Sequence, residues 1–394
     1  MKIALVIPNF DPHVGGAERW TWDFAARLLR HGHAVHVVAE SFAQGTGTEM
    51  RGVVPHVVPR VFGTFRQQRF GFAAAAEKTL RRLDVDVIHD MGHGWHFNVF
   101  MPHGGTRGGS MRQNVALWPA GMRWLKHAAT TILPRYRTFR ELERRQYVPD
   151  GSRLFVALSQ MVGRDMSRFH AVPDDVARVV YNGIDTQRFS PDHRARHRDR
   201  VRRELGVRNE VVFLLVGHNF KLKGVGPAIR AIATLSRERR DVRLAVVGGD
   251  RPGRYERLAA RLDCPDLVQF VGRTRDSVPY YAAADVYLHP TYYDPCSLVV
   301  LEALASGLPV ITSRNNGAGE LMTAGREGFI LDDPANIAAM TDAMRKFLNE
   351  SFRAAASRAA RELAEQHDLE RNYREILAVY EDAIRRAPLA RRRA

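Results

Sequence analysis

Residues 292–309, YYDPCSLVVLEALASGLP, carry the strongest signal for the fold in this sequence. After the turn residues Asp-Pro comes an apolar run of good helix formers, and Gly307 and Pro309 end that run as they commonly end helices. Apolar segments that are typical of buried strands flank it at 285–289 and 310–313. The stretch therefore predicts the crossover helix of a parallel βαβ unit.

The start of this predicted helix is a candidate anion site. Ser297 is a plausible N-cap, and the backbone N–H groups of Ser297, Leu298 and Val299 are expected to be free and to lie at the positive end of the helix dipole. Asp294 and Glu302 bracket them, and carboxylates are good acceptors for sugar hydroxyls. The pattern favours a ligand with a diphosphate and sugars, although a turn aspartate and an exposed helix glutamate explain the same residues equally well.

Length and composition indicate a globular protein of two to three domains. The 394 residues are 45% hydrophobic and 26% charged, which is ordinary for a protein with buried cores. No apolar run approaches the roughly 20 residues that span a bilayer, and the N-terminal MKIALVIPNF is expected to be a buried strand rather than a signal peptide. Cys264 and Cys296 form neither a disulfide framework nor a metal spacing, so a reducing cytoplasm is expected.

The chain is strongly basic, with 59 Lys and Arg residues against 43 Asp and Glu residues and a formal net charge of +16. Such an excess suits nucleic acid, an anionic membrane surface or a phosphorylated substrate. The arginine usage of a GC-rich genome explains the excess equally well. The net charge alone therefore selects no partner.

Strands and helices alternate in two blocks, which predicts two doubly wound, Rossmann-like α/β domains. We expect an N-terminal domain at 1–187 and a second domain at 188–368, with a C-terminal helix at about 369–394 packed back on the first. Ligands bind such sheets at the carboxyl ends of the strands, so the two domains are expected to face a central cleft. The strands of the first block are expected at 2–7, 33–39, 85–89 and 97–101, and those of the second at 211–216, 243–247, 268–271, 285–289 and 310–313.

Residues 104–147 interrupt this alternation. The segment starts with a Gly-rich stretch that is expected to be mobile, and Trp118 and Trp124 follow among many arginines, opposed only by Glu141 and Glu143. A basic segment with aromatic side chains is typical of an element that binds an anionic membrane surface. A helix packed on the domain with a solvated arginine face is the alternative.

Glycines and cations stand where predicted strands end. Gly15 and Gly16 precede the first helix and allow a ligand close to the backbone, although a plain tight turn uses the same residues. His103 follows a strand and is a candidate acid or base, although several histidines lie close to it in sequence. Lys223 is placed to neutralise a leaving diphosphate, or else is a solvated surface charge. The dinucleotide, Walker A, zincin and nucleophile-elbow motifs are absent from the sequence.

Together these features resemble the GT-B glycosyltransferases of the large retaining, nucleotide-sugar-dependent family 4, over nearly the whole chain. The long block at 282–313 is the most specific part of the resemblance. VGHNFKLKGV, GGDRPGRYERLA and FVGRTRDS carry a narrower resemblance to the lipopolysaccharide core glucosyltransferase branch. The other matching segments are GGAER at 15–19, VYNGIDTQRF at 180–189, the Lys-Gly pair at 223–224, VGR at 271–273 and residues 317–320.

The resemblance implies a role for each candidate residue. Asp294 and Glu302 would be the E-x7-E pair, with Asp in place of the first Glu; the first would contact the hydroxyls of the donor sugar and the second the ribose. The amides of Gly16 and of Ser297, Leu298 and Val299 would hold the diphosphate together with Lys223, and His103 would lie beside the transferred sugar.

The resemblance also implies where the nucleotide base binds and how the phosphate charge is met. The base would stack near Gly272 and Arg273. His218 stands where the family usually has an arginine, and Leu222 stands where it usually has a second one. Members of this type need no metal, because cations and helix dipoles replace it.

The function expected from the sequence is that of a retaining hexosyltransferase. It would transfer a hexose, glucose in the narrower resemblance, from a UDP-sugar to a lipopolysaccharide-core or other lipid-linked glycan at the cytoplasmic face of the inner membrane, without a cofactor, metal or nucleic acid. A sugar-nucleotide epimerase or phosphorylase on the same fold is the alternative among enzymes. A non-catalytic basic protein that binds membranes or polyanions is the alternative from another class, and the carboxylate pair argues against it because polyanion binding needs none.

Overall fold

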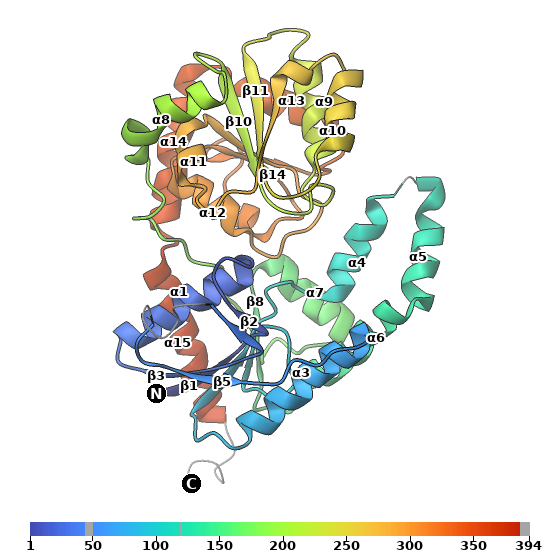
Figure 1. Cartoon of the computed structure of the whole chain (residues 1–394), viewed down its shortest axis with the longest axis vertical. Helices are drawn as coiled ribbons and strands as arrows, with labels where there is room; N and C mark the ends of the chain where they lie inside the picture. Colours follow the sequence, from blue (N-terminus) through green and yellow to red (C-terminus); the bar gives the residue numbers. More distant parts are fainter. Residues whose placement is uncertain (44–49, 119, 387–394) are drawn as a thin grey trace. The chain divides into compact units, whose positions relative to one another are not determined.

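The computed structural model describes residues 1–43, 50–118 and 120–386, and the chain divides into two compact units (Figure 1). Unit 1 combines Met1–Val180 with the C-terminal segment from Asn372, and unit 2 is Tyr181–Arg371. The sequence predicts the boundary between the two domains near residue 187, but in the structure unit 2 begins at Tyr181. The reason is local, since the Asn182 side chain already donates to the Cys296 carbonyl of unit 2 at 2.8 Å.

Unit 1 is built on a seven-stranded parallel sheet in the order β5-β3-β1-β6-β7-β8-β9, beside a two-stranded sheet of β2 and β4. The first strand pairs with β3 on one side and β6 on the other, so the strand order reverses between β1 and β6. The strands are β1 (Lys2–Val6), β2 (Asn9–Phe10), β3 (Ala34–Ala39), β4 (Ser41–Phe42), β5 (Val53–Val57), β6 (Val87–Asp90), β7 (Val99–Phe100), β8 (Leu154–Ala157) and β9 (Ala177–Val179).

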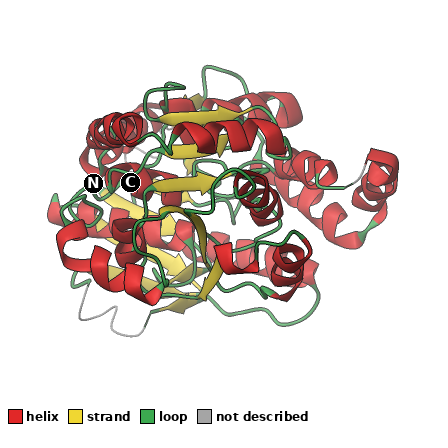
Figure 2. Cartoon of the chain, turned by 90° about the horizontal axis from the view of Figure 1, so that it is seen from above, coloured by secondary structure: helices red, strands yellow, loops and turns green. Residues whose placement is uncertain are grey.

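The view from above shows helices (red) flanking the strands (yellow) of the chain (Figure 2). Among the described residues, no helix of the chain combines the length and the apolar composition needed to cross a bilayer. The helices of unit 1 are α1 (Gly16–Arg30), α3 (Phe65–Leu80), α4 (Arg107–Ala116), η1 (Ala120–Met122), α5 (Arg123–Ile132), α6 (Pro134–Gln146), α7 (Gln160–His170) and α15 (Leu369–Arg386).

The Gly-rich start of the 104–147 segment is helical, which corrects the expectation of a mobile loop. Thr106 is the N-cap of α4, and its hydroxyl accepts the Gly109 N–H at 3.0 Å. Gly109 is buried, and a Cβ atom there would lie 2.0 Å from an Asp165 side-chain oxygen, so glycine is required by packing rather than by flexibility. Pro119 lies outside the described residues.

The C-terminal helix α15 packs on unit 1 through tyrosines. Tyr373 and His33 share a hydrogen bond at 2.9 Å, and Tyr380 shares one with the buried His89 at 2.6 Å. Helix α15 begins at Leu369, where the sequence predicts the C-terminal helix, and α14 (Glu350–Glu365) precedes it in unit 2. The last predicted residues of the tail, 387–394, lie outside the described residues.

Unit 2 contains a six-stranded parallel sheet in the order β12-β11-β10-β13-β14-β15. Its central strands are buried along nearly their whole length, because helices cover both faces. The strands are β10 (Val211–Val216), β11 (Val242–Val247), β12 (Val268–Gly272), β13 (Val286–His289), β14 (Val310–Ser313) and β15 (Gly328–Leu331), and the helices are α8 (His193–Glu204), α9 (Val225–Leu235), α10 (Gly253–Arg261), η2 (Pro265–Leu267), α11 (Val278–Ala283), α12 (Leu298–Ala305), η3 (Gly317–Leu321), α13 (Ile337–Lys346) and α14.

The βαβ unit that the sequence predicts around residues 292–309 is confirmed. Helix α12 spans Leu298–Ala305, and the strands on either side of it, β13 and β14, are parallel neighbours. Strand β13 also pairs with β10, so the order of unit 2 reverses between β10 and β13. The loops that leave these two strands are therefore the place where an open α/β sheet binds its ligand.

Candidate active site

Two loops of unit 2 meet at the reversal point, and main-chain contacts hold them together. The carbonyl of Leu222, in the loop after β10, accepts the Tyr292 N–H at 2.8 Å and the Thr291 hydroxyl at 3.2 Å from the loop after β13. Gly224 has φ +77°, and a Cβ atom on it would lie 2.2 Å from the Pro290 carbonyl oxygen. Only glycine fits this close approach, which fixes the position of the neighbouring Lys223.

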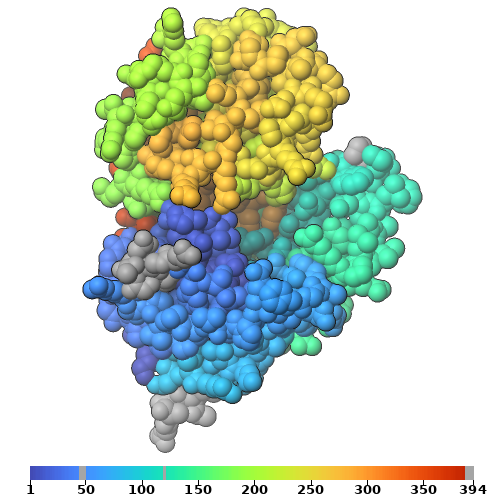
Figure 3. Space-filling view, in the orientation of Figure 1, coloured from blue at the N-terminus to red at the C-terminus, as the bar shows by residue number. Residues whose placement is uncertain are grey.

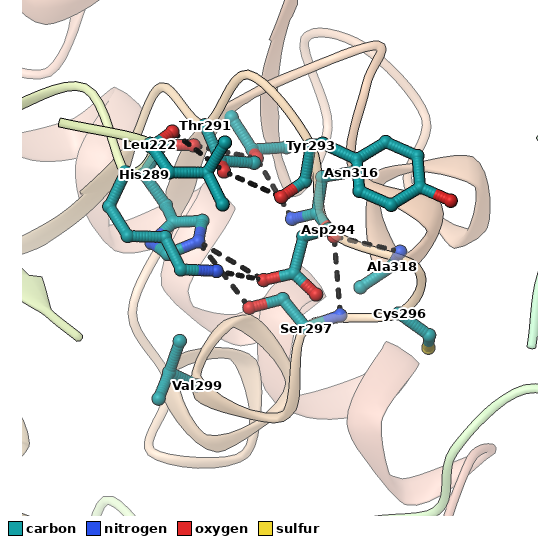
Figure 4. Close-up of polar contacts among 12 residues, drawn as sticks. Leu222, His289, Thr291, Tyr293, Asp294, Cys296, Ser297, Val299, Asn316 and Ala318 are labelled. Carbon is teal, nitrogen blue, oxygen red and sulfur yellow. Dashed lines mark hydrogen bonds and ion pairs between the residues drawn. The ribbon is translucent and has the colours of Figure 1, made fainter. Parts of the chain in front are cut away.

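Lys223 and Asp294 form an ion pair across these loops. Figure 4 shows Asp294 with its neighbours His289 and Ser297. The Lys223 Nζ atom lies 2.5 Å from Asp294 Oδ2, with side chains 17% and 13% exposed, so the pair is largely shielded from water. Burial by itself would raise the pKa of Asp294, but the Lys223 charge and the hydrogen bonds from His289 and Lys223 outweigh it and hold that pKa well below its usual range. The carboxylate is therefore ionised throughout the neutral pH range.

His289, the last residue of β13, completes this cluster. Its Nε2 atom lies 3.6 Å from Asp294 Oδ2 and 3.5 Å from Ser297 Oγ, and its Nδ1 atom lies 3.3 Å from the Tyr287 hydroxyl. Burial lowers the pKa of His289, and the Lys223 charge adds to this against the opposing effect of Asp294, so the imidazole is neutral at pH 7. His289 therefore orients the Asp294 carboxylate without neutralising it.

The start of α12 offers fewer free amides than the sequence predicts. Ser297 is the N-cap, but its side chain makes no capping hydrogen bond, and its N–H donates to Asn316 Oδ1 at 3.2 Å. The same Asn316 oxygen accepts the Ala318 N–H at 3.1 Å, so Asn316 ties α12 to the loop after β14. The expectation of a free Ser297 amide is thus wrong, whereas the N–H groups of Leu298 and Val299 have no acceptor within the described parts of the chain.

Glu302 lies one turn into α12 and contacts a buried tyrosine. The Tyr281 hydroxyl donates to Glu302 Oε2 at 2.8 Å and approaches the Val299 carbonyl at 3.2 Å. Burial and the nearby Glu302 charge raise the pKa of Tyr281 well above its usual value, so the hydroxyl keeps its proton and remains a donor. This contact orients Glu302, which is half-buried at the surface of α12.

Other candidates of unit 2 gather at the ends of β10, β11 and β12. A Cβ atom on Gly249 would lie 3.6 Å from the Arg273 side chain and 3.8 Å from His218 Nδ1, which places both exposed side chains beside the Gly248-Gly249 turn. Gly272 has φ +87°, a conformation that favours glycine. A flat base could lie over this glycine-lined surface between a cation and an imidazole.

The remaining candidates, Gly15, Gly16 and His103, lie in unit 1. Gly16 is the first residue of α1, and Gly15, its N-cap, is extended. His103 lies in the loop after β7 with its ring 4.8 Å from Trp20, and its buried Nε2 atom has no hydrogen-bond partner in the described chain. Burial lowers the pKa of His103 to about 3, so the imidazole is neutral at pH 7.

Sequence reasoning missed three residues that build the site in unit 2, namely His289, Asn316 and Tyr281. His289 and Asn316 carried a signal, since each is a polar residue at or just after the end of an otherwise apolar strand. Tyr281 carried none, because a tyrosine in a short apolar helix reads as core.

Two family models match the chain in succession. The model described as Glycosyltransferase Family 4 matches residues 14–188, and the model described as Glycosyl transferases group 1 matches residues 197–363. Together they span both units. The second match contains β10, β13 and α12, and with them the Lys223–Asp294 pair.

Curated relatives agree on the class of enzyme and differ in the substrates that their names give. The lipopolysaccharide glucosyltransferase WaaG of Escherichia coli (strain K12) is 30% identical over 60% of this chain and 64% of its own length. A D-inositol 3-phosphate glycosyltransferase of Corynebacterium kroppenstedtii is 33% identical over 64% of this chain and 58% of its own length. The chain thus matches less than two thirds of either relative.

The architecture is that of a solved glycosyltransferase. The crystal structure of WaaG, a glycosyltransferase involved in lipopolysaccharide biosynthesis, superposes with a TM-score of 0.80 at 24% identity, covering 96% of this chain and 99% of that one. With its two parallel α/β units and the two successive family matches, this chain belongs to the GT-B glycosyltransferases, with a family 4 domain in its first half and a group 1 domain in its second.

Proposed function

We propose that this glycosyltransferase transfers a hexose, glucose in the first instance, from a UDP-sugar to a lipopolysaccharide-core or other lipid-linked glycan, with retention of anomeric configuration and without a metal. The observation that carries the proposal is the Lys223–Asp294 pair at the reversal point of the unit 2 sheet, next to the free amides of Leu298 and Val299. A nucleotide-sugar has a diphosphate for the lysine and the amides, and sugar hydroxyls for the carboxylates.

Each polar group of the site has a task in this reaction. Lys223 and the α12 amides stabilise the additional negative charge that develops on the diphosphate as its bond to the sugar breaks. Asp294, held by His289, accepts hydrogen bonds from the hydroxyls of the transferred sugar, and Glu302, held by Tyr281, accepts them from the ribose. Donor binding separates Lys223 from Asp294, because both then turn to the ligand.

The transfer proceeds on one face of the sugar. The bond between the anomeric carbon and the diphosphate oxygen breaks, and a bond to the acceptor oxygen forms from the same side. The proton of the acceptor hydroxyl passes to the leaving diphosphate, so no side chain needs to act as the base. His103, which is neutral at pH 7, is assigned to a hydrogen bond with the transferred sugar rather than to proton transfer.

A thermal-shift panel of UDP-, GDP- and ADP-sugars on the full chain tests the donor. Ligand binding to the folded state raises the melting temperature by mass action, so UDP-glucose is expected to give the largest shift. EDTA is expected to leave that shift unchanged, and NMR of the product is expected to show the anomeric configuration of the donor. A panel in which no nucleotide-sugar stabilises the protein would overturn the proposal.

The proposed place of action is an anionic membrane surface, contacted through the 104–147 segment. Helix α5 presents apolar side chains to solvent, with Trp124 and Ile132 each 67% exposed and Leu125 47% exposed. The segment is seen at the surface of unit 1 (teal in Figure 3), and its helices α5 and α6 also carry many arginines. Exposed apolar and cationic groups in one helical segment favour binding at the lipid headgroup level.

Vesicle co-sedimentation tests this placement. The variant Trp124→Ala/Ile132→Ala is expected to lose binding to vesicles that contain phosphatidylglycerol, while the wild type binds them better than neutral phosphatidylcholine vesicles. Phe62→Ala is the matched control, because Phe62 is an exposed apolar residue of unit 1 outside the segment. Equal binding by the double variant and the control would exclude α5 as the contact.

A further inference from the structure

Unit 1 carries a cluster of three arginines, Arg69, Arg107 and Arg135, that has no role in the proposed transfer reaction. The Arg69 and Arg135 guanidinium groups each lie 5.4 Å from the centroid of the Phe65 ring, and the Arg107 guanidinium lies 4.2 Å from that of Phe139. The two rings touch edge to face at 4.9 Å. Three cations from α3, α4 and α6 therefore converge on one aromatic pair, and α3 and α6 lie side by side (Figure 1).

None of these arginines has an ion-pair partner. Among the described residues, no carboxylate oxygen lies within 4.0 Å of the side-chain nitrogens of Arg69, Arg107 or Arg135, whereas Arg66 on the same helix as Arg69 pairs with Glu141. Glu143 accepts the backbone N–H of Arg107 at 2.8 Å and lies 3.6 Å from His170, so its carboxylate is already engaged. Glu40 is the other acid whose charge reaches Arg69, and it too lies beyond ion-pair distance.

This lack of a counter-charge has an energetic cost. Arg69 and Arg107 are half-buried, and burial lowers the pKa of each guanidinium, although the charge of Glu40 acts against this at Arg69 and that of Glu143 at Arg107. Contacts with the aromatic rings offset only part of the repulsion and desolvation of three cations held together. A negatively charged ligand would remove the imbalance.

The cluster also lies where this sheet should bind a ligand. The Arg69 Nη1 atom lies 3.4 Å from Nδ1 of His93, in the loop after β6, the strand at which the order of the unit 1 sheet reverses. The buried Asp90 at the end of β6 accepts the backbone N–H groups of residues 92, 93 and 94, which fixes this loop. His103, whose buried Nε2 atom has no hydrogen-bond partner among the described residues, lies in the loop after β7, the strand next to β6.

We propose that Arg69, Arg107 and Arg135 bind a phosphate ester of the acceptor substrate. The inference rests on the proposed function, and it narrows the acceptor to a phosphorylated one. A phosphate has three oxygens that guanidinium forks can share, and it supplies the charge that the cluster lacks. Arg107 begins α4, so the positive end of that helix adds to the attraction.

The test measures binding of inorganic phosphate to the full chain by thermal shift, with saturating UDP present to occupy the donor site. Chloride at equal ionic strength corrects for salt. The wild type is expected to show a phosphate-dependent shift, and Arg69→Gln and Arg135→Gln are each expected to weaken the phosphate affinity about tenfold, as the loss of one charged hydrogen-bonding group does. Because Arg135 is exposed, its replacement leaves the fold intact.

Arg66→Gln is the matched control, since Arg66 lies one turn earlier on α3 and pairs with Glu141. It is expected to bind phosphate as the wild type does. A phosphate shift that is absent from the wild type, equal in all variants, or matched by the same concentration of acetate would overturn the proposal. A loss of binding to phosphatidylglycerol vesicles in Arg69→Gln with its phosphate shift intact would also overturn it, because the cluster would then serve the membrane.

The two proposals fail in distinguishable ways. If UDP itself gives no thermal shift, the proposed function is wrong. If UDP stabilises the wild type and every arginine variant alike while phosphate affinity is unaffected by Arg69→Gln and Arg135→Gln, only the acceptor-phosphate site is wrong.

Discussion

The two units carry their positive charge in opposite ways. In unit 2, Lys223 stands 2.5 Å from the Asp294 carboxylate, and His289 holds that carboxylate from the other side. In unit 1, three arginines surround Phe65 and Phe139 without a carboxylate within 4.0 Å among the described residues. The protein itself supplies the counter-charge of Lys223, whereas the counter-charge of the three arginines would come from a ligand.

The same type of α/β unit can thus carry two kinds of ligand site, one with a paired cation and one with unpaired cations. A lysine paired with a carboxylate is held in place before the ligand binds. The ligand must compete with the carboxylate for the lysine, which favours a sugar donor that contacts both side chains at once. Unpaired arginines raise the energy of the empty protein, and any suitable anion lowers it. The predictions below test this difference between the two units.

Asp294→Asn should have the largest effect. The substitution keeps the size of the side chain but leaves Lys223 largely buried without its counter-charge, and the donor sugar loses a charged acceptor. We expect kcat/KM for UDP release from UDP-glucose, with a membrane extract as acceptor, to fall roughly 100- to 1000-fold. Asp332→Asn removes a surface partner of Arg314 in the same unit and should change the rate less than twofold; equal rates in the two variants would remove Asp294 from the site.

Gly224→Ala should destabilise unit 2 by about 3 kcal/mol, because the new Cβ atom must both adopt φ +77° and displace the Pro290 carbonyl. Gly206→Ala separates these causes, since Gly206 has φ +62° with no atom within 4 Å of the added Cβ. We expect it to cost about 1 kcal/mol, the strain alone. Urea unfolding measures both, and equal losses would mean that the β10 and β13 loops are not locked together.

The stability of unit 1 should fall in acid through His103. Burial lowers its folded pKa to about 3, below that of the unfolded chain, so the unfolded state binds the proton first and stability is lost as the pH falls below about 6.5. His103→Gln should therefore reduce the loss of unfolding free energy between pH 7 and pH 5 by roughly 1–2 kcal/mol. Urea unfolding at the two pH values tests this, and an unchanged pH dependence would show that His103 titrates normally.

Glu302→Gln should have the smallest effect. The amide keeps an oxygen for the Tyr281 hydroxyl but loses the charge that is assigned to the ribose, so the KM for UDP-glucose should rise about tenfold with little change in melting temperature. Tyr281→Phe removes only the orienting hydrogen bond and should raise KM less. If Tyr281→Phe has the larger effect on KM, Glu302 acts through packing rather than through ribose contact.

Much of the fold could be predicted because its signals are local. The apolar run and its Gly and Pro punctuation place α12 at Leu298–Ala305, where the structure has it, and the alternation of apolar strands predicts the parallel sheets. The Gly-rich start of α4 was misjudged because glycine reads as flexible in sequence, whereas Gly109 is required by the Asp165 side chain from another helix. The free Ser297 amide was misjudged because its acceptor, Asn316, lies beyond the next strand.

The order of strands and helices, the crossover helix within residues 292–309 and the residue types able to bind a nucleotide-sugar could all be predicted from the sequence. These features could be predicted because periodicity and turn chemistry act over a few neighbouring residues. Three features of the site became visible only in the tertiary structure. Lys223 pairs with Asp294, and His289 and Tyr281 orient the two carboxylates. Arg69, Arg107 and Arg135 share one aromatic pair without a counter-charge. The Lys223–Asp294 and Tyr281–Glu302 contacts join residues 71 and 21 positions apart, and the free energy of an ion pair depends on distance and burial, which no local pattern encodes.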